Sequence, residues 1–131
     1  MIAELLCVGI GGFLGACARY LITQMSKDFG VPVPLGTLIS NVTAGFLIGL
    51  IIGAEQQTQA LSPSVKLFLT TGFLGGLSTF SAFSLETVNL VENEKYVLAI
   101  LNIFLNLALS FAGVILGFAV AKLLFSPAVK V

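Results

Sequence analysis

Four long apolar segments separated by short polar turns make up almost the whole of this 131-residue chain. They cover residues 5–25, 36–53, 65–91 and 96–124, and the turns between them are rich in charged residues, Gln, Gly and Pro. A helix crosses a bilayer with about 20 predominantly apolar residues. The pattern therefore predicts an all-α membrane protein with four transmembrane helices, forming a single transmembrane domain over residues 1–131.

The third apolar segment has an unusual centre. Its residues 72–85 read GFLGGLSTFSAFSL, which combines Gly, Ser and Thr with two phenylalanines three positions apart. We expect this helix to be interrupted near the Gly75-Gly76 pair, over Gly75-Gly76-Leu77-Ser78. Non-helical backbone at membrane depth is tolerated only inside protein or beside a wet cavity. Freed carbonyls and amides at such breaks commonly bind ions or substrates. The stretch is therefore the predicted functional site.

Composition supports a membrane protein and narrows its chemistry. Hydrophobic residues make up 57% of the chain and charged residues only 9%, whereas soluble domains are about 25% charged. Six Lys and Arg balance six Asp and Glu, and no basic patch with interleaved aromatic residues indicates nucleic-acid binding. Histidine is absent, which removes the commonest general base and metal ligand. Without a nucleophile–base pair, an enzyme is disfavoured.

Glycines recur four residues apart in every apolar segment. Such small-residue faces let membrane helices approach closely, so packing is the expected role of Gly11 and Gly15, of Gly45, Gly49 and Gly53, of Gly72 and Gly76, and of Gly113 and Gly117. Gly75 lies outside this spacing. Four tightly packed helices leave no central hole, so a transport pathway would need an oligomer or a subunit interface.

Positive charges are divided evenly between the two sides of the predicted bundle. Cytoplasmic loops normally carry more Lys and Arg than the opposite side, but here three residues lie on each side: Lys27, Lys95 and Arg19 on one, and Lys66, Lys122 and Lys130 on the other. No orientation is favoured, which predicts dual topology. Chains inserted both ways can pair as an antiparallel two-fold homodimer.

Polar and aromatic residues in the spans are candidates for an ion path. Asn41 lies on the helix face of Gly45 and could be a pore-lining donor or a bridge between helices. Phe80 and Phe83 could present their weakly positive ring edges to an anion, or could simply pack. Ser81 and Ser84, on another face of the same helix, could offer hydroxyl groups.

A polar stripe marks the fourth segment, where Asn102, Asn106 and Ser110 are spaced four apart and favour a wet path. Glu86 and Arg19 are charges within spans, which usually face a cavity but can also reach the interface. Amides, hydroxyls and ring edges suit a small anion that accepts hydrogen bonds. These residues do not identify the ion.

Three motifs connect the chain to a known family. GGFLGACARY at 11–20, GTLISNVTAGFLIG at 36–49 and GFLGGLSTFSAFS at 72–84, followed by Glu86-Thr87, resemble the CrcB/Fluc family of fluoride channels. The resemblance implies a fluoride-selective channel that passively exports fluoride across the cell inner (plasma) membrane. It also implies a dual-topology homodimer, embedded in lipid, with two antiparallel pores.

The resemblance also implies roles for individual residues. Asn41, Phe80 and Phe83 would line each pore, and a structural Na⁺ at the two-fold axis would be held by the backbone carbonyls of Gly75 and Ser78. Arg19 would lie in the vestibule, and the residues expected near the ion path are Thr37, Ser81, Ser84 and Glu86. The chain departs from the family pattern at Ala82, where a Thr is common, and at Asn102 and Asn106, where some members carry Tyr and Ser.

A small four-helix multidrug or cation exporter is the main alternative, because such proteins are also short and of dual topology. Exchange of protons for cations requires a carboxylate embedded in the membrane. The first segment offers only Glu4, close to the start of the chain.

The even charge distribution makes dual topology testable. Adding a few Lys or Arg residues to one end of the chain should bias its insertion. A biased chain expressed alone should lose transport, and co-expression with an oppositely biased copy should restore it. Full transport by one fixed orientation, measured in vesicles, would contradict the antiparallel arrangement.

Overall fold

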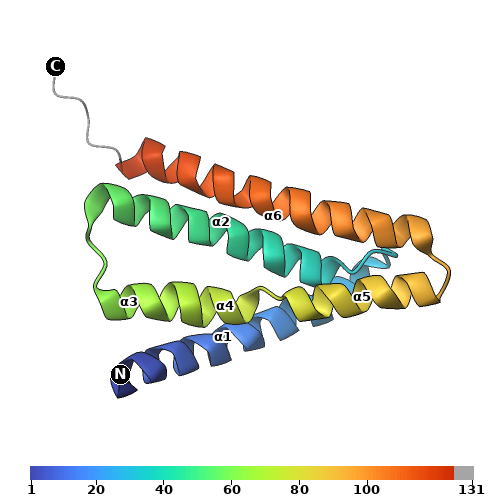
Figure 1. Ribbon diagram of the computed structural model, residues 1–131, viewed down its shortest axis with the longest axis horizontal. Helices are drawn as coiled ribbons and strands as arrows, with labels where there is room; N and C mark the ends of the chain where they lie inside the picture. Colours follow the sequence, from blue (N-terminus) through green and yellow to red (C-terminus); the bar gives the residue numbers. More distant parts are fainter. Residues whose placement is uncertain (126–131) are drawn as a thin grey trace.

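The computed structural model describes residues 1–125 as an all-helical protein (Figure 1). Four helices or helical runs are long and apolar enough to cross a membrane: Ile2–Phe29, Leu35–Thr58, Pro63–Glu92 and Tyr96–Phe125. This confirms the four predicted spans, and the chain is a multi-pass membrane protein. Pro127 and Lys130, which we placed after the fourth span, lie outside the described residues.

The helices run back and forth between the two ends of the molecule. Helix α1 (Ile2–Ser26) continues into a short 3₁₀ helix, η1 (Lys27–Phe29), and α2 (Leu35–Thr58) returns. After the third span, α6 (Tyr96–Phe125) runs back again. The connections after η1 and before α6 lie at one end, while both described termini and the connection after α2 lie at the other (Figure 1).

The third span is divided into four segments. They are α3 (Pro63–Leu67), the π-helix η2 (Phe68–Leu74), α4 (Gly75–Leu77) and α5 (Phe80–Glu92). The span begins as its sequence predicts. The Ser62 hydroxyl accepts a hydrogen bond from a backbone N–H of the first turn, and a proline follows it.

The position of the non-helical residues refines one expectation. We expected the interruption near Gly75-Gly76, within residues 75–78, but both glycines are helical, and Gly75 has φ −64° and ψ −36°. The extended residues are Ser78 (φ −77°, ψ 155°) and Thr79 (φ −154°, ψ 126°). Glycine permits a break without requiring one. Thr79 instead acts as an N-cap, because its hydroxyl accepts the Ala82 N–H and so starts α5.

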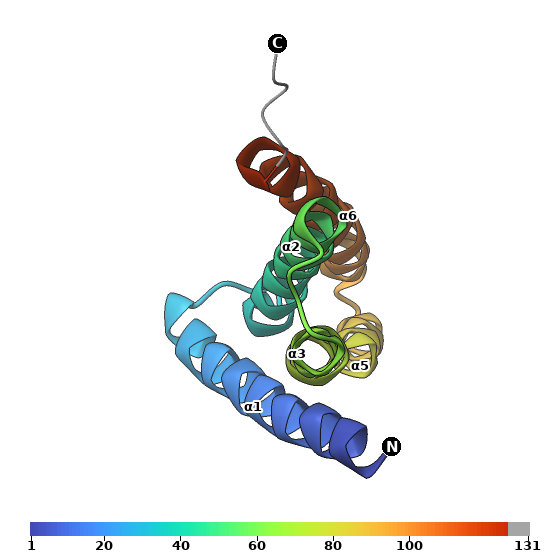
Figure 2. The ribbon, with the colours of Figure 1, turned by 90° about the vertical axis from the view of Figure 1, so that its left-hand side faces the viewer.

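Two helix pairs form the body of the molecule. Helix α2 packs along α6, and α1 packs against the first part of the third span (Figures 1 and 2). Glycines stand where backbones meet: a Cβ at Gly45 would lie 2.8 Å from the Ser110 carbonyl oxygen, and one at Gly76 would lie 2.5 Å from the Gly12 carbonyl oxygen. Gly75 differs, since a Cβ there would lie 3.8 Å from its nearest neighbour, the Thr70 carbonyl oxygen.

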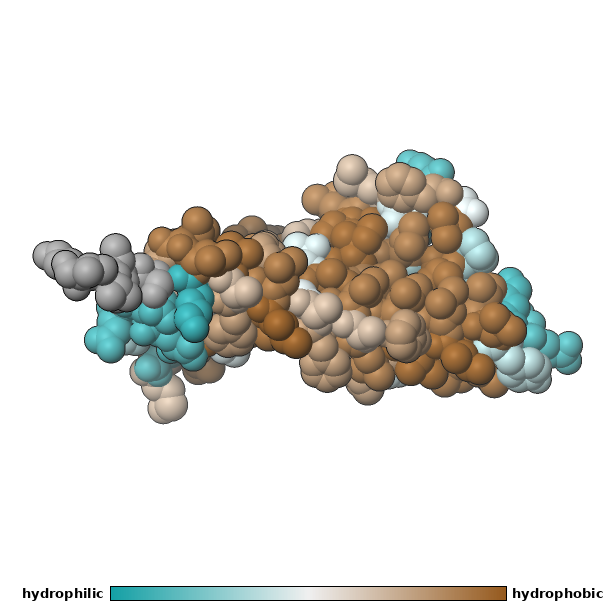
Figure 3. All heavy atoms as spheres, turned by 90° about the horizontal axis from the view of Figure 1, so that it is seen from above, coloured by the Kyte–Doolittle hydropathy of each residue, from teal (hydrophilic) through white to brown (hydrophobic). Residues whose placement is uncertain are grey.

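The outer surface is strongly apolar, with polar residues gathered towards the ends of the molecule (Figure 3). Large side chains such as Phe13, Phe104 and Ile115 are 64–69% exposed, whereas the buried apolar core is small and includes Leu74 and Leu77. A soluble protein rarely exposes such large apolar patches. The surface therefore suits contact with lipid and with other membrane helices.

The close helix contacts predict that a single methyl group is harmful at one glycine and harmless at another. A Cβ at Gly117 would overlap the Phe46 carbonyl oxygen and lie 2.7 Å from the Leu50 nitrogen, whereas none of the surrounding atoms lies within 4 Å of a Cβ at Gly9. Overpacking costs about 1–3 kcal/mol. Gly117→Ala should therefore reduce stability by about that amount, measured by unfolding in detergent. The control, Gly9→Ala, should be neutral or slightly stabilising, and equal stability of the two variants would contradict the packing role.

Candidate functional site

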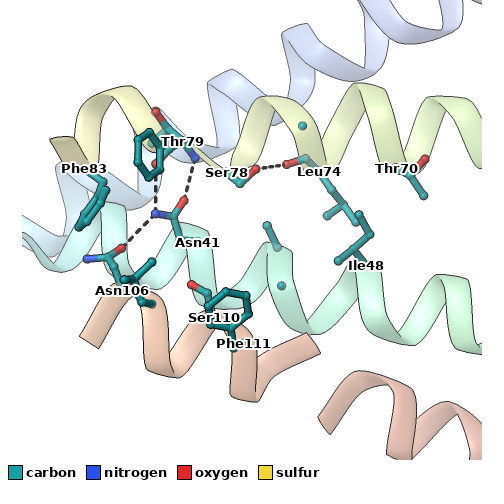
Figure 4. Close-up of a pocket in the computed structure, with 15 residues that line it drawn as sticks. Asn41, Ile48, Thr70, Leu74, Ser78, Thr79, Phe83, Asn106, Ser110 and Phe111 are labelled. Atoms are coloured by element: carbon teal, nitrogen blue, oxygen red, sulfur yellow. Dashed lines mark hydrogen bonds between the residues drawn. The ribbon is translucent and has the colours of Figure 1, made fainter. Parts of the chain in front are cut away.

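A groove of about 350 Å³ lies between α2, the third span and α6 (Figure 4). Seven predicted site residues line it, from the second, third and fourth spans. The complete lining is Asn41, Ala44, Gly45, Ile48, Thr70, Leu74, Gly75, Ser78, Thr79, Phe80, Phe83, Asn106, Leu107, Ser110 and Phe111. None of these side chains carries a formal charge, so the groove is apolar with a few hydrogen-bonding groups.

Asn41 binds the extended backbone of the third span with both ends of its amide. Its Oδ1 accepts the Thr79 N–H at 2.7 Å, and its Nδ2 donates to the Thr79 carbonyl at 3.1 Å (Figure 4). The Thr79 N–H, which would donate to the Gly75 carbonyl in a continuous α-helix, is thus satisfied by a side chain. Of the two roles open to Asn41, the structure shows it bridging helices while it also lines the groove.

The same amide begins a ladder of hydrogen bonds that reaches α5 through α6. Asn41 Nδ2 donates to Asn106 Oδ1 at 3.0 Å, and Asn106 Nδ2 donates to Asn102, at 3.1 Å to its carbonyl and 3.0 Å to its Oδ1. Asn102 Nδ2 donates to Thr87 Oγ1 at 2.9 Å, and that hydroxyl donates to the Phe83 carbonyl at 2.8 Å. We call the five residues joined by these bonds the amide ladder: Asn41, Asn106, Asn102, Thr87 and Phe83.

The three residues of the predicted polar stripe differ in their surroundings. Asn102 is fully buried and does not line the groove, whereas Asn106, 4% exposed, does. Ser110 also lines the groove, and within the described residues its buried hydroxyl has no hydrogen-bond partner. The stripe therefore contributes two members to the groove and one to the packing beneath it.

Phe80 and Phe83 lie together at the groove, with ring centroids 5.4 Å apart and ring planes tilted by 58°. Phe80 is 75% exposed and Phe83 only 7%. Tilted rings turn an edge towards neighbouring groups. Both rings are therefore positioned to contact a molecule in the groove, one from the open side and one from the protein interior.

The two serines between and beside these rings lie outside the groove. The Ser81 hydroxyl is 3.3 Å from the Thr79 hydroxyl, and the Ser84 hydroxyl donates to the Phe80 carbonyl at 2.8 Å. Ser84 is thereby bound to its own helix, as is common for hydroxyls within membrane helices. Neither serine lines the groove.

The candidate charged residues Arg19 and Glu86 also lie outside the groove. Thr37 is 3% exposed and donates to Glu86 Oε1 at 2.6 Å, while Glu86 Oε2 is buried without a partner in the described part of the chain. Arg19 Nε donates to the Gly76 carbonyl at 3.1 Å. Thus Arg19 anchors α4 to α1, and Glu86 joins α5 to α2.

The third span offers backbone oxygen atoms as possible ligands for a cation. Among residues 1–125, no three His, Cys, Asp or Glu side chains are arranged to hold a metal. Gly75 is exposed, and the usual helical donor to its carbonyl, the Thr79 N–H, is bound to Asn41. The Ser78 hydroxyl donates to the Leu74 carbonyl at 2.9 Å. The proton of this hydroxyl is thus used within the helix.

Two residues of the site were not predicted from the sequence. Thr79 provides the backbone partner of Asn41, and Thr87 ends the amide ladder. A threonine just before an apolar helical run is a typical N-cap, which could have identified Thr79. Thr87 could not have been identified in the same way, because its partner Asn102 lies on another helix. Its only sequence signal is its position one helical turn after Phe83.

Comparison with known proteins agrees with the motifs. The family model of CrcB-like protein, Camphor Resistance (CrcB), matches residues 6–118. Proteins named fluoride-specific ion channel FluC are similar to the chain. One from Clostridium perfringens is 48% identical over 92% of this chain and 94% of its own length. Another, from Serratia proteamaculans, is 43% identical over 90% and 93%. These relatives are named as ion channels, not enzymes, and the chain belongs to the CrcB-like protein family.

Proposed function

We propose that this protein is a fluoride-selective ion channel that passively exports fluoride across the cell inner membrane. The observation that carries the proposal is the uncharged groove in which the Asn41 amide and the Phe80 and Phe83 rings come together. The names of the relatives, which describe fluoride-specific ion channels, support the same function.

The chemistry of the groove suits a small, strongly hydrated anion. A dry passage must replace the water of the ion with protein donors while still letting the ion leave. The Asn41 Nδ2 group and the positive ring edges offer partial positive charge. The Ser110 hydroxyl, which has no hydrogen-bond partner among residues 1–125, offers a further donor. Asn106 lies beside them, with its Oδ1 bound to Asn41.

The pathway requires a second copy of the chain. In one protomer the groove is open at its side, and both Phe80 and Gly75 are exposed there. In an antiparallel homodimer each protomer would cover the open groove of the other, and a two-fold axis would make the two resulting pores equivalent. The even split of Lys and Arg supports insertion in both orientations.

We further propose a structural Na⁺ at the centre of this dimer, held by the backbone carbonyls of Gly75 and Ser78. Oxygen is the ligand that hard cations prefer. The diversion of the Thr79 N–H to Asn41 leaves the Gly75 carbonyl available. The exposure of Gly75 supports this proposal, because a second copy could cover this residue.

The remaining predicted residues are assigned to the ends of the path. Arg19 would attract anions to a vestibule, and the positions proposed next to the ion path are Thr37, Glu86, Ser81 and Ser84. The pair of Thr37 and Glu86 joins two helices that flank the groove. Its role would be to hold this part of the path in shape.

Fluoride efflux from protein-loaded liposomes, followed with a fluoride-selective electrode, tests the function. A hydrogen bond to a charged partner is worth about 1.5–3 kcal/mol, and about 1.4 kcal/mol is a factor of ten in rate. Asn41→Leu should therefore slow efflux at least about tenfold. Phe80→Ile and Phe83→Ile, which keep apolar bulk but lose the ring edges, should also reduce efflux while the dimer still forms.

Phe104→Ile is the matched control for the aromatic substitutions, because Phe104 is 64% exposed on α6 and does not line the groove. It should keep the wild-type rate. Wild-type efflux by all three groove variants would show that these residues only pack. Absence of fluoride efflux from the unmodified protein would overturn the function itself.

The Na⁺ site predicts a different pattern. Because the ligands are backbone carbonyls, Ser78→Ala should retain transport, while Gly75→Val should lose it by placing a branched side chain beside the ion. Complete removal of Na⁺ from liposomes and buffers should abolish fluoride efflux. Full efflux without Na⁺ would contradict the proposal of a structural Na⁺ but would not contradict the proposal that the protein conducts fluoride.

A further inference from the structure

We infer that Thr87 and Asn102 are positioning residues that hold the Asn41 amide firmly in the direction set by the Thr79 backbone, although neither touches the groove. This inference deepens the proposed function and rests on it for the meaning of Asn41. It assigns to Asn102 a role different from the wet path that its spacing suggested.

Backbone groups determine the direction of the ladder at both ends. At one end, the Thr79 N–H can only donate and the Thr79 carbonyl can only accept. Asn41 must therefore turn its Oδ1 to the first and its Nδ2 to the second. At the other end, the Phe83 carbonyl can only accept, so the Thr87 hydroxyl donates to it and offers its lone pairs to Asn102.

The amides between these ends have one arrangement that satisfies all their neighbours. Asn102 donates to Thr87, which leaves Asn102 Oδ1 as an acceptor. Asn106 donates both to that oxygen and to the Asn102 carbonyl, so its own Oδ1 faces Asn41. Donation therefore runs in one direction, from Asn41 through Asn106 and Asn102 to Thr87.

Burial makes this order costly to reverse. Asn102 is 0% exposed and Asn106 is 4% exposed, so neither amide can exchange a lost partner for bulk water. A buried polar group without a partner is expensive, and networks of this kind strengthen or fail together. If the Thr87 hydroxyl is lost, Asn102 has no acceptor for its donated N–H and gains freedom to turn. Asn106 then keeps the Asn102 backbone carbonyl but loses Asn102 Oδ1 as its second acceptor, so its own Oδ1 is held less firmly towards Asn41.

Two separate measurements test this inference. The first is exchange of the Thr79 backbone N–H with solvent deuterium, followed by NMR of the full chain in lipid nanodiscs, which requires no transport. Thr87→Val, which keeps the branched shape and removes the hydroxyl, should speed this exchange about three- to tenfold, since one hydrogen bond contributes about that factor. Asn102→Leu should act in the same direction. Thr87→Ser, which restores the hydroxyl, should return exchange to the wild-type rate.

The second measurement is fluoride efflux from liposomes. Thr87→Val should slow it about three- to tenfold, and Thr87→Ser should not. Thr71→Val and Asn89→Leu are matched controls, because both residues are exposed on the third span and have no part in the ladder or the groove. They should change neither Thr79 exchange nor efflux.

The outcomes separate this inference from the proposed function. Faster Thr79 exchange in Thr87→Val and Asn102→Leu supports the positioning role whether or not the protein conducts fluoride. Slower efflux with unchanged Thr79 exchange would overturn it, because these residues would then act on the ion or the fold without Asn41. Unchanged exchange and unchanged efflux would overturn it as well.

Discussion

The pairing of Asn41 with both backbone groups of Thr79 is the interaction on which the site depends. Lipid offers no hydrogen bonds, so a backbone that leaves its helix within the membrane must find partners in the protein. Asn41 Oδ1 and Nδ2 supply them at 2.7 and 3.1 Å. The amide thereby makes the extended residues possible, and the extended residues turn Phe80 and Phe83 to the groove.

Close helix packing brings the partners of this pairing within reach. Hydrogen bonds from α2 to both the third span and α6 require short distances between backbones, and the glycines of α2 allow them. A Cβ at Gly45 would lie 2.8 Å from the Ser110 carbonyl oxygen. Gly45 is one helical turn from Asn41 on α2, and Ser110 is one helical turn from Asn106 on α6. Small residues thus do more than join helices. They bring the side chains of the amide ladder close enough to interact.

The sequence predicted most of the fold because the bilayer constrains it strongly. Hydropathy alone located the four spans, and the glycine spacing located their contacts. Within the site, Asn41, Phe80, Phe83, Asn106 and Ser110 were predicted from polarity and spacing, and all line the groove. The exact interruption was not predictable from the Gly75-Gly76 pair, because the N-cap at Thr79 and a partner 38 residues away decide it. The buried position of Asn102 depends on Thr87 in another helix, which no local pattern reveals.

The positions of the candidate charged residues Arg19 and Glu86 suggest why the groove itself is neutral. Arg19 is bound to the Gly76 carbonyl and Glu86 to Thr37, and neither lines the groove. A fixed positive charge about 4 Å from an anion would attract it by about 4 kcal/mol at an effective dielectric constant of 20. Because about 1.4 kcal/mol is a factor of ten, such a charge would slow release of the ion roughly a thousandfold. Amide and ring-edge donors attract an anion more weakly and from several sides. A groove built from them can therefore favour entry of an anion and still permit its release.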